Sequence, residues 1–132
     1  MANIINFSDA ASIGLHSMIL IAKSDKPINA IQLSNILGNS KHHIGKVLQR
    51  LVKDGFLSSY RGPTGGFVME ADPNTTTLYD VYESIEGKSK IKLCPEDNHI
   101  CPVDKCIKKN VIKKLSDEFV SYMESQKLID YL

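Results

Sequence analysis

Apolar residues recur every three or four positions in the first part of the chain, which is the spacing of a buried helical face. The first such stretch predicts a helix over about residues 8–23, and a short helix is expected over 30–37. A third helix is predicted from Ser40 to Gly55. Its buried stripe consists of Ile44, Val47, Leu48 and Leu51.

The turn between the second and third helices is short and contains Gly38. Two short helices joined in this way are typical of a helix-turn-helix, although many helix hairpins share the pattern without touching DNA. Residues 56–60 and 66–69 follow as two expected strands, joined by a loop with one arginine, one proline and several glycines. A helix-turn-helix followed directly by such a hairpin predicts a winged helix.

The second half of the chain predicts two more helices. One runs from about Thr77 to Gly87, and a long final helix is expected from about Asp104 to Gln126. The apolar positions of the final helix are Ile107, Val111, Ile112, Leu115, Phe119, Tyr122 and Met123. Such a face suits a partner helix across a dimer twofold axis, with packing on its own domain as the alternative.

These elements define the expected fold class, which is mainly α with a small β-hairpin. The expected organisation is a winged helix-turn-helix DNA-binding domain over 1–87, a cysteine sensor loop over 88–106, and a dimerisation helix with a tail over 104–132. Hydrophobic residues make up 42% of the 132 residues, enough for one core. No apolar run is long enough to span a membrane and no secretory signal is visible, so we expect a cytoplasmic protein without a membrane partner.

The net charge of +1 hides an uneven distribution. Residues 1–68 carry seven Lys and Arg against three acids, and residues 69–132 carry nine Lys against twelve acids. A basic first half and an acidic second half suggest that the first half meets phosphate.

All three cysteines, Cys94, Cys101 and Cys106, lie within 13 residues. An odd number in a cytosolic chain argues against a disulfide framework, and the clustering argues against three unrelated core thiols. Thiolates are the preferred ligands of iron–sulfur clusters, so the loop is a candidate site for a 2Fe–2S or 4Fe–4S cluster. Zinc and redox-active thiols without a metal remain alternatives.

The loop between the two strands has the sequence Tyr-Arg-Gly-Pro-Thr-Gly-Gly-Phe over residues 60–67. This motif, the third helix and the segment after the hairpin resemble the Rrf-two family of bacterial winged-helix transcription regulators. The resemblance covers nearly the whole chain. It implies a homodimer whose last helices cross, a near-palindromic double-stranded DNA operator, and in several members a cluster held by three cysteines that responds to redox state or nitric oxide.

The resemblance leaves the fourth cluster ligand open. Lys109 stands three residues after Cys106, where some members have a histidine. His16 falls on a position of the first helix that supplies a histidine ligand in some relatives, whereas Ser12 replaces the acidic ligand of others. His16 and Asp9 are the main candidates and His99 is the third; alternatively, Asp9 simply stabilises the start of its helix.

The expected DNA-reading surface has two parts. The resemblance to the family implies that the first turn of the third helix, from Ser40 to His43 and including His42, reads bases, and we expect Lys41, Lys46 and Arg50 to hold phosphates. In the wing, Arg61 is expected in a narrow minor groove. Gly62, Thr64 and Gly65 complete this predicted surface. The alternative for each lysine is an ordinary solvated charge.

We therefore expect a transcription regulator that acts as a repressor and whose operator binding is switched by an iron–sulfur cluster. A thiol-redox or zinc-containing winged-helix regulator is the alternative. An enzyme is not expected because the sequence has no phosphate-binding loop and no cofactor fingerprint. A winged helix that binds protein is a further alternative, which the basic first half and Arg61 argue against.

Overall fold

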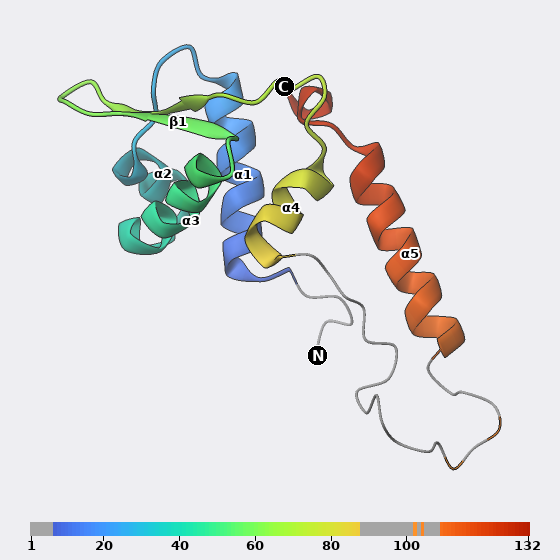
Figure 1. The fold of residues 1–132 in the computed structure, drawn as a ribbon. Coiled ribbons are helices and arrows are strands. Elements are labelled where there is room, and N and C mark those ends of the chain that lie inside the picture. Colours follow the sequence, from blue (N-terminus) through green and yellow to red (C-terminus); the bar gives the residue numbers. More distant parts are fainter. Residues whose placement is uncertain (1–6, 88–101, 103, 105–108) are drawn as a thin grey trace.

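The computed structural model describes residues 7–87, 102, 104 and 109–132. The described residues form mainly helices and one hairpin, which confirms the expected fold class (Figure 1). In chain order the elements are α1 Asp9–Lys23, α2 Ala30–Leu37, α3 Lys41–Lys53, β1 Leu57–Tyr60, β2 Gly66–Met69, α4 Leu78–Glu86, α5 Lys109–Ser125 and the 3-10 turn η1 Leu128–Tyr131. No helix within these ranges is both long and apolar enough to cross a bilayer.

The helices begin at side chains that satisfy free backbone N–H groups. The Ser8 hydroxyl accepts a hydrogen bond from the Ala11 amide at 3.0 Å, so Ser8 and not Asp9 caps α1. Capping boxes are present at the starts of α2 and α4, formed by Asn29 with Gln32 and by Thr77 with Asp80. Gly38 ends α2 with a φ of 81°, in the left-handed region that favours glycine. These local signals explain why the predicted boundaries of α1 to α4 agree closely with the structure.

The core lies where α3 and α4 pack against α1. The predicted stripe of α3 is confirmed, because all four of its apolar residues are buried. Met18 of α1 and Leu33 of α2 are fully buried beside it. Gly14 on α1 allows close packing, since a Cβ at this position would clash with the flexible end of Ile85 on α4. This packing holds α3 at a defined angle across α1.

The hairpin is antiparallel, with Leu57 opposite Met69 and Tyr60 opposite Gly66. It is attached to the body by an additional bridge between Phe67 and Ile28, which precedes α2. The Phe67 amide donates to the Ile28 carbonyl at 2.8 Å, and the Ile28 amide donates to the Phe67 carbonyl at 3.2 Å. Strand β2 is therefore paired with β1 on one edge and with Ile28 on the other, and this second pairing attaches the wing to the body.

The final helix differs from the prediction at its start. Asp104 lies in a bend, and the described part of the helix begins at Lys109. Of the described side chains in the first half of α5, Val111 is 57% exposed and Leu115 is 38% exposed. Its second half packs on its own domain through the buried Met123, and η1 then buries Leu128 completely. The segment predicted as a plain tail is part of the core.

Candidate DNA-binding face and the approach to the cysteine loop

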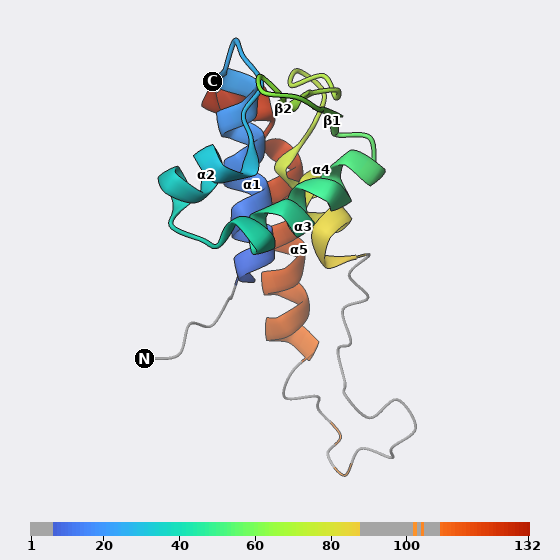
Figure 2. The same cartoon turned by 90° about the vertical axis from the view of Figure 1, so that its left-hand side faces the viewer.

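Helix α3 crosses the front of the molecule in Figure 2, with the hairpin above it and α5 behind. Lys41, His42 and Lys46 are exposed on it, and α3 contains no acidic residue. Within the described part of the chain none of these three side chains forms an ion pair. The Ser40 hydroxyl accepts a hydrogen bond from the His43 amide at 3.2 Å, so Ser40 caps the helix and exposes its hydroxyl. The helix dipole and Lys41 together make this end attractive to a phosphate or a base edge.

The tip of the wing is exposed from Arg61 to Thr64. Gly62 has a φ of 112°, which disfavours any side chain there. A Cβ at Gly65 would lie 2.4 Å from the Tyr60 carbonyl oxygen, so the loop closes tightly on itself. Beside the tip is an open groove of about 400 Å³, lined by Pro27, Tyr60, Arg61, Thr64, Gly65 and Val68. The wing thus presents one cationic side chain on a tightly turned loop.

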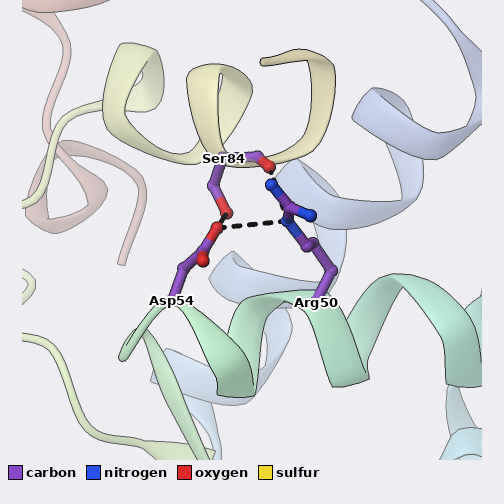
Figure 3. Close-up of polar contacts among 3 residues, drawn as sticks. All are labelled: Arg50, Asp54 and Ser84. Atoms are coloured by element: carbon purple, nitrogen blue, oxygen red, sulfur yellow. Dashed lines mark hydrogen bonds and ion pairs between the residues drawn. The ribbon is translucent and has the colours of Figure 1, made fainter. Parts of the chain in front are cut away.

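Arg50, predicted to contact phosphate, instead directs its Nε toward its own chain (Figure 3). This Nε donates to Asp54 Oδ2 at 3.2 Å and to the backbone carbonyl of Ser84 at 3.0 Å. The Ser84 hydroxyl donates to the same carboxylate. We call Arg50, Asp54 and Ser84 the α3–α4 clamp. The Arg50 side chain is 51% exposed, so its other guanidinium nitrogens can still reach a phosphate.

The α3–α4 clamp also lowers the pKa of the Asp54 carboxyl group. The hydrogen bond from Ser84 is the largest influence on Asp54 and holds its pKa below the ordinary value of 3.8. Burial is the next largest influence and raises this pKa, while Arg50 and Lys53 lower it further. Asp54 is therefore ionised over the whole neutral range and remains an acceptor for both partners.

His16 and Asp9, the candidate cluster ligands on α1, are both exposed. His16 Nδ1 lies 2.7 Å from the backbone carbonyl oxygen of Ser12. Because a carbonyl can only accept, Nδ1 donates this hydrogen bond, and in a neutral ring this tautomer leaves the lone pair on Nε2 for a metal. Histidines that bind metals commonly have this arrangement. His16 also lines a small surface pocket of about 170 Å³ with Ser12, Ile13, Leu37 and Asn39.

Cys94, Cys101, Cys106 and His99 lie outside the described residues, so their predicted role is neither confirmed nor contradicted by the structure. Among the residues that are described, no group of three or more His, Cys, Asp or Glu side chains could hold a metal ion. The described residues nearest to the loop in sequence on its N-terminal side are Gly87, which caps α4, and the last turn of α4, which ends at Glu86.

The exposed apolar residues of α5 form a narrow stripe. At 100° per residue, Val111, Leu115 and Tyr122 fall within an arc of about 40°. All three are exposed, at 57%, 38% and 57%. On the same scale Phe119 and Met123 lie at about 80° and 120°, directly beside this stripe, and they pack on their own domain. The final helix therefore has one broad apolar face, and the described chain leaves one edge of it uncovered.

Sequence reasoning missed Asp54 and Ser84 as parts of this face. The spacing of Arg50 and Asp54, four residues apart on a helix, was a visible signal for an ion pair. Ser84 carried no such signal, because it lies 30 residues further along the chain on another helix. Ile28 was missed for the same reason.

Comparison with known proteins gives one family and several structures. A family model named Rrf2, described as an iron-dependent transcriptional regulator, matches residues 7–132. The structure resembles CymR (YrzC), the global cysteine regulator of B. subtilis, with 22% identity, a TM-score of 0.76, and coverage of 96% of this chain and 95% of that chain. T. potens IscR has 21% identity and a TM-score of 0.76, with coverage of 96% and 85%. The oxidised form of Staphylococcus aureus CymR has 19% identity and a TM-score of 0.73, with coverage of 94% and 93%.

Proposed function

The chain belongs to the Rrf2 family of iron-dependent transcriptional regulators, and we propose that it is a cytoplasmic homodimer that represses transcription from a near-palindromic operator. Its affinity for the operator follows the state of the three-cysteine loop. The observation that carries the DNA-binding part is the acid-free recognition helix α3, whose exposed Lys41, His42 and Lys46 lie on one face without ion pairs in the described chain.

The proposed contacts follow from this exposure. Ser40, Lys41, His42 and His43 enter the major groove, where a histidine ring can donate to or accept from base edges. Lys46 and Arg50 lie further along α3 and hold phosphates. Arg61 at the wing reaches a minor groove. Gly62, Thr64 and Gly65 let the wing approach the DNA backbone closely.

The dimer is supported by the exposed stripe of α5. Val111, Leu115 and Tyr122 would otherwise leave a row of apolar side chains in water. A second copy of the same helix, related by a twofold axis, covers such a stripe in both chains at once. Two recognition helices in a twofold dimer match an operator whose half-sites are about 34 Å apart.

In the sensor part, Cys94, Cys101 and Cys106 would hold an iron–sulfur cluster, with His16 or Asp9 as the fourth ligand. A bound cluster would supply a redox-sensitive group that can be lost or attacked. The free Nε2 of His16 favours this residue over Asp9, whose position in the first turn of α1 already suits the helix dipole. A thiol-redox regulator without a metal is the second candidate, favoured by the likeness in fold to CymR in an oxidised form. A zinc-containing regulator is the third.

The DNA-binding proposal is tested by titrating operator DNA with Lys41→Ala, His42→Ala and Arg61→Ala. Loss of a base contact should weaken operator binding by about 1–3 kcal/mol. Loss of a phosphate contact should lower the slope of log affinity against log salt by about 0.9. Lys113→Ala on α5 is the matched control, since Lys113 is exposed on a different helix. Equal effects of all four substitutions would contradict the proposal.

The sensor proposal is tested by purifying the protein without oxygen and measuring iron, sulfide and visible absorption. A Cys94→Ala, Cys101→Ala, Cys106→Ala variant should lack all three signals. His16→Ala and Asp9→Ala are then compared, and the variant that loses the cluster identifies the fourth ligand. A colourless parent protein that contains zinc, or no metal with thiols that oxidise reversibly, would replace the iron–sulfur proposal with one of the two alternatives.

A further inference from the structure

The last turn of α4, from Tyr82 to Glu86, is contacted by three other helices or their caps. Ser84 joins it to α3 through the α3–α4 clamp. Glu86 accepts a hydrogen bond from the hydroxyl of Ser8, the residue that caps α1. This turn is followed by Gly87 and then by residue 88, where the predicted cysteine loop begins. It is therefore one of the two described segments that flank the loop, the other being the start of α5, and it is hydrogen-bonded both to α3 and to the cap of α1.

An aromatic cluster extends the same turn to α5. Tyr82 packs edge-on against Phe7, with ring centroids 5.9 Å apart, and against Phe119 of α5 at 5.3 Å. Phe7 also contacts Phe119 at 5.7 Å. The residue before the α1 cap, the end of α4 and the middle of α5 thus form one packed unit. Because packed side chains resist independent movement, these elements respond together.

Within the described chain, the hydrogen bonds that join α4 to the recognition helix lie at the C-terminal end of α3. Arg50 and Asp54 lie at the C-terminal end of α3, whereas the base-reading turn begins at Lys41, nine residues earlier. At a rise of 1.5 Å per residue, these two ends of α3 are about 14 Å apart. A tilt of α3 by about 5° around the clamp therefore displaces the base-reading turn by about 1 Å. A displacement of this size is enough to break well-formed hydrogen bonds to bases.

We propose that Ser84 is a positioning residue that carries the state of the cysteine loop to the recognition helix through the α3–α4 clamp. This inference rests on the proposed function, in which the loop controls operator binding. Ser84 does not contact DNA in this arrangement. It sets the angle of α3 by holding the Asp54 carboxylate and, through its backbone carbonyl, the Arg50 guanidinium.

The test is a double-mutant cycle that combines substitution of the three cysteines with Ser84→Ala. Operator affinity is measured with intact cysteines and with the Cys94→Ala, Cys101→Ala, Cys106→Ala variant, each with Ser84 and with Ser84→Ala. Alanine is a better helix former than serine, so the substitution leaves α4 intact. Asp54→Ala is the second variant, and it should act like Ser84→Ala because both remove the same hydrogen bond.

Ser58→Ala is the matched control. The Ser58 hydroxyl donates to the Glu70 carboxylate within the hairpin, so this variant loses the same kind of hydrogen bond without affecting the link between α3 and α4. Iron and sulfide content and the melting temperature are measured for every variant. They show whether a change in DNA binding comes from the loop itself or from partial unfolding.

With intact Ser84, the ratio of affinities between the two loop states should be about 5- to 150-fold. Ser84→Ala and Asp54→Ala should lower this ratio by about 2- to 30-fold with unchanged iron content, and Ser58→Ala should leave it unchanged. A large ratio that Ser84→Ala does not alter overturns the inference alone. A parent protein with the same affinity in both loop states overturns the proposed function, and the inference with it.

Discussion

Ile28 and Phe67 exchange two backbone hydrogen bonds, although they lie on opposite sides of the helix-turn-helix in the sequence. Gly66, the residue before Phe67, passes so close to this bridge that a Cβ there would lie 2.7 Å from the carbonyl carbon and oxygen of Ile28. Its φ of 156° is also one that other residues rarely adopt. The orientation of the wing therefore depends on a contact with the segment that leads into α2.

Gly66→Ala is expected to destabilise the protein by about 1–3 kcal/mol, because the new methyl group strains the backbone and pushes Ile28 away. Urea unfolding followed by circular dichroism measures this change. Gly45→Ala is the control, since Gly45 lies in α3 with open space around it. This control should be stabilised by about 0.5–1 kcal/mol. Similar stabilities of the two variants would show that the bridge does not constrain Gly66.

Leu128→Ala is expected to cost about 2–5 kcal/mol of unfolding free energy, because the side chain is completely buried. The backbone supports the same conclusion, since the Leu128 amide donates to the Thr76 carbonyl at 3.0 Å. Leu132→Ala, at a residue that is 46% exposed, should cost much less. If both substitutions had equally small effects in thermal unfolding, η1 would not belong to the core.

In Ser84→Ala, the pKa of Asp54 is expected to rise toward 3.8, since the hydrogen bond from Ser84 is the main cause of its lowered value. A carboxyl group with a lowered pKa in the folded state stabilises the protein above its unfolded pKa. This contribution is lost as the pH falls through the folded pKa. When the pH is lowered from neutral to about 3, the free energy of unfolding of Ser84→Ala should therefore fall by less than that of the parent protein. Carboxyl-carbon NMR titration measures the pKa directly, and an unchanged value would mean that the Ser84 bond does not form in solution.

Leu115→Glu is expected to convert the proposed dimer into a monomer, because it places a charge in the middle of the apolar stripe of α5. Sedimentation equilibrium gives the mass of each species. Lys113→Glu adds the same side chain at an exposed position of the same helix and should remain dimeric. If the Leu115→Glu variant sediments as a dimer, the dimer interface does not include the apolar stripe of α5.

Most of the winged helix could be predicted from the sequence because its signals are local. The caps at Ser8, Asn29, Ser40 and Thr77 act within three residues of themselves. The turn at Gly38 and the glycines of the wing are likewise properties of a few neighbouring residues. The apolar stripe of α3 follows from helical periodicity alone. The exposed cationic residues of α3 follow from the same periodicity, since they lie on its opposite face.

Tertiary structure decided which distant segments meet. Arg50 contacts Ser84, 34 residues away, and the C-terminal η1 turn packs back on the loop before α4. A polar side chain can form hydrogen bonds with many partners, and an apolar face can pack against many others. The local sequence does not determine which partner is chosen. The selection is made by the close packing of α1, α3 and α4, which leaves Arg50 and Asp54 facing the last turn of α4.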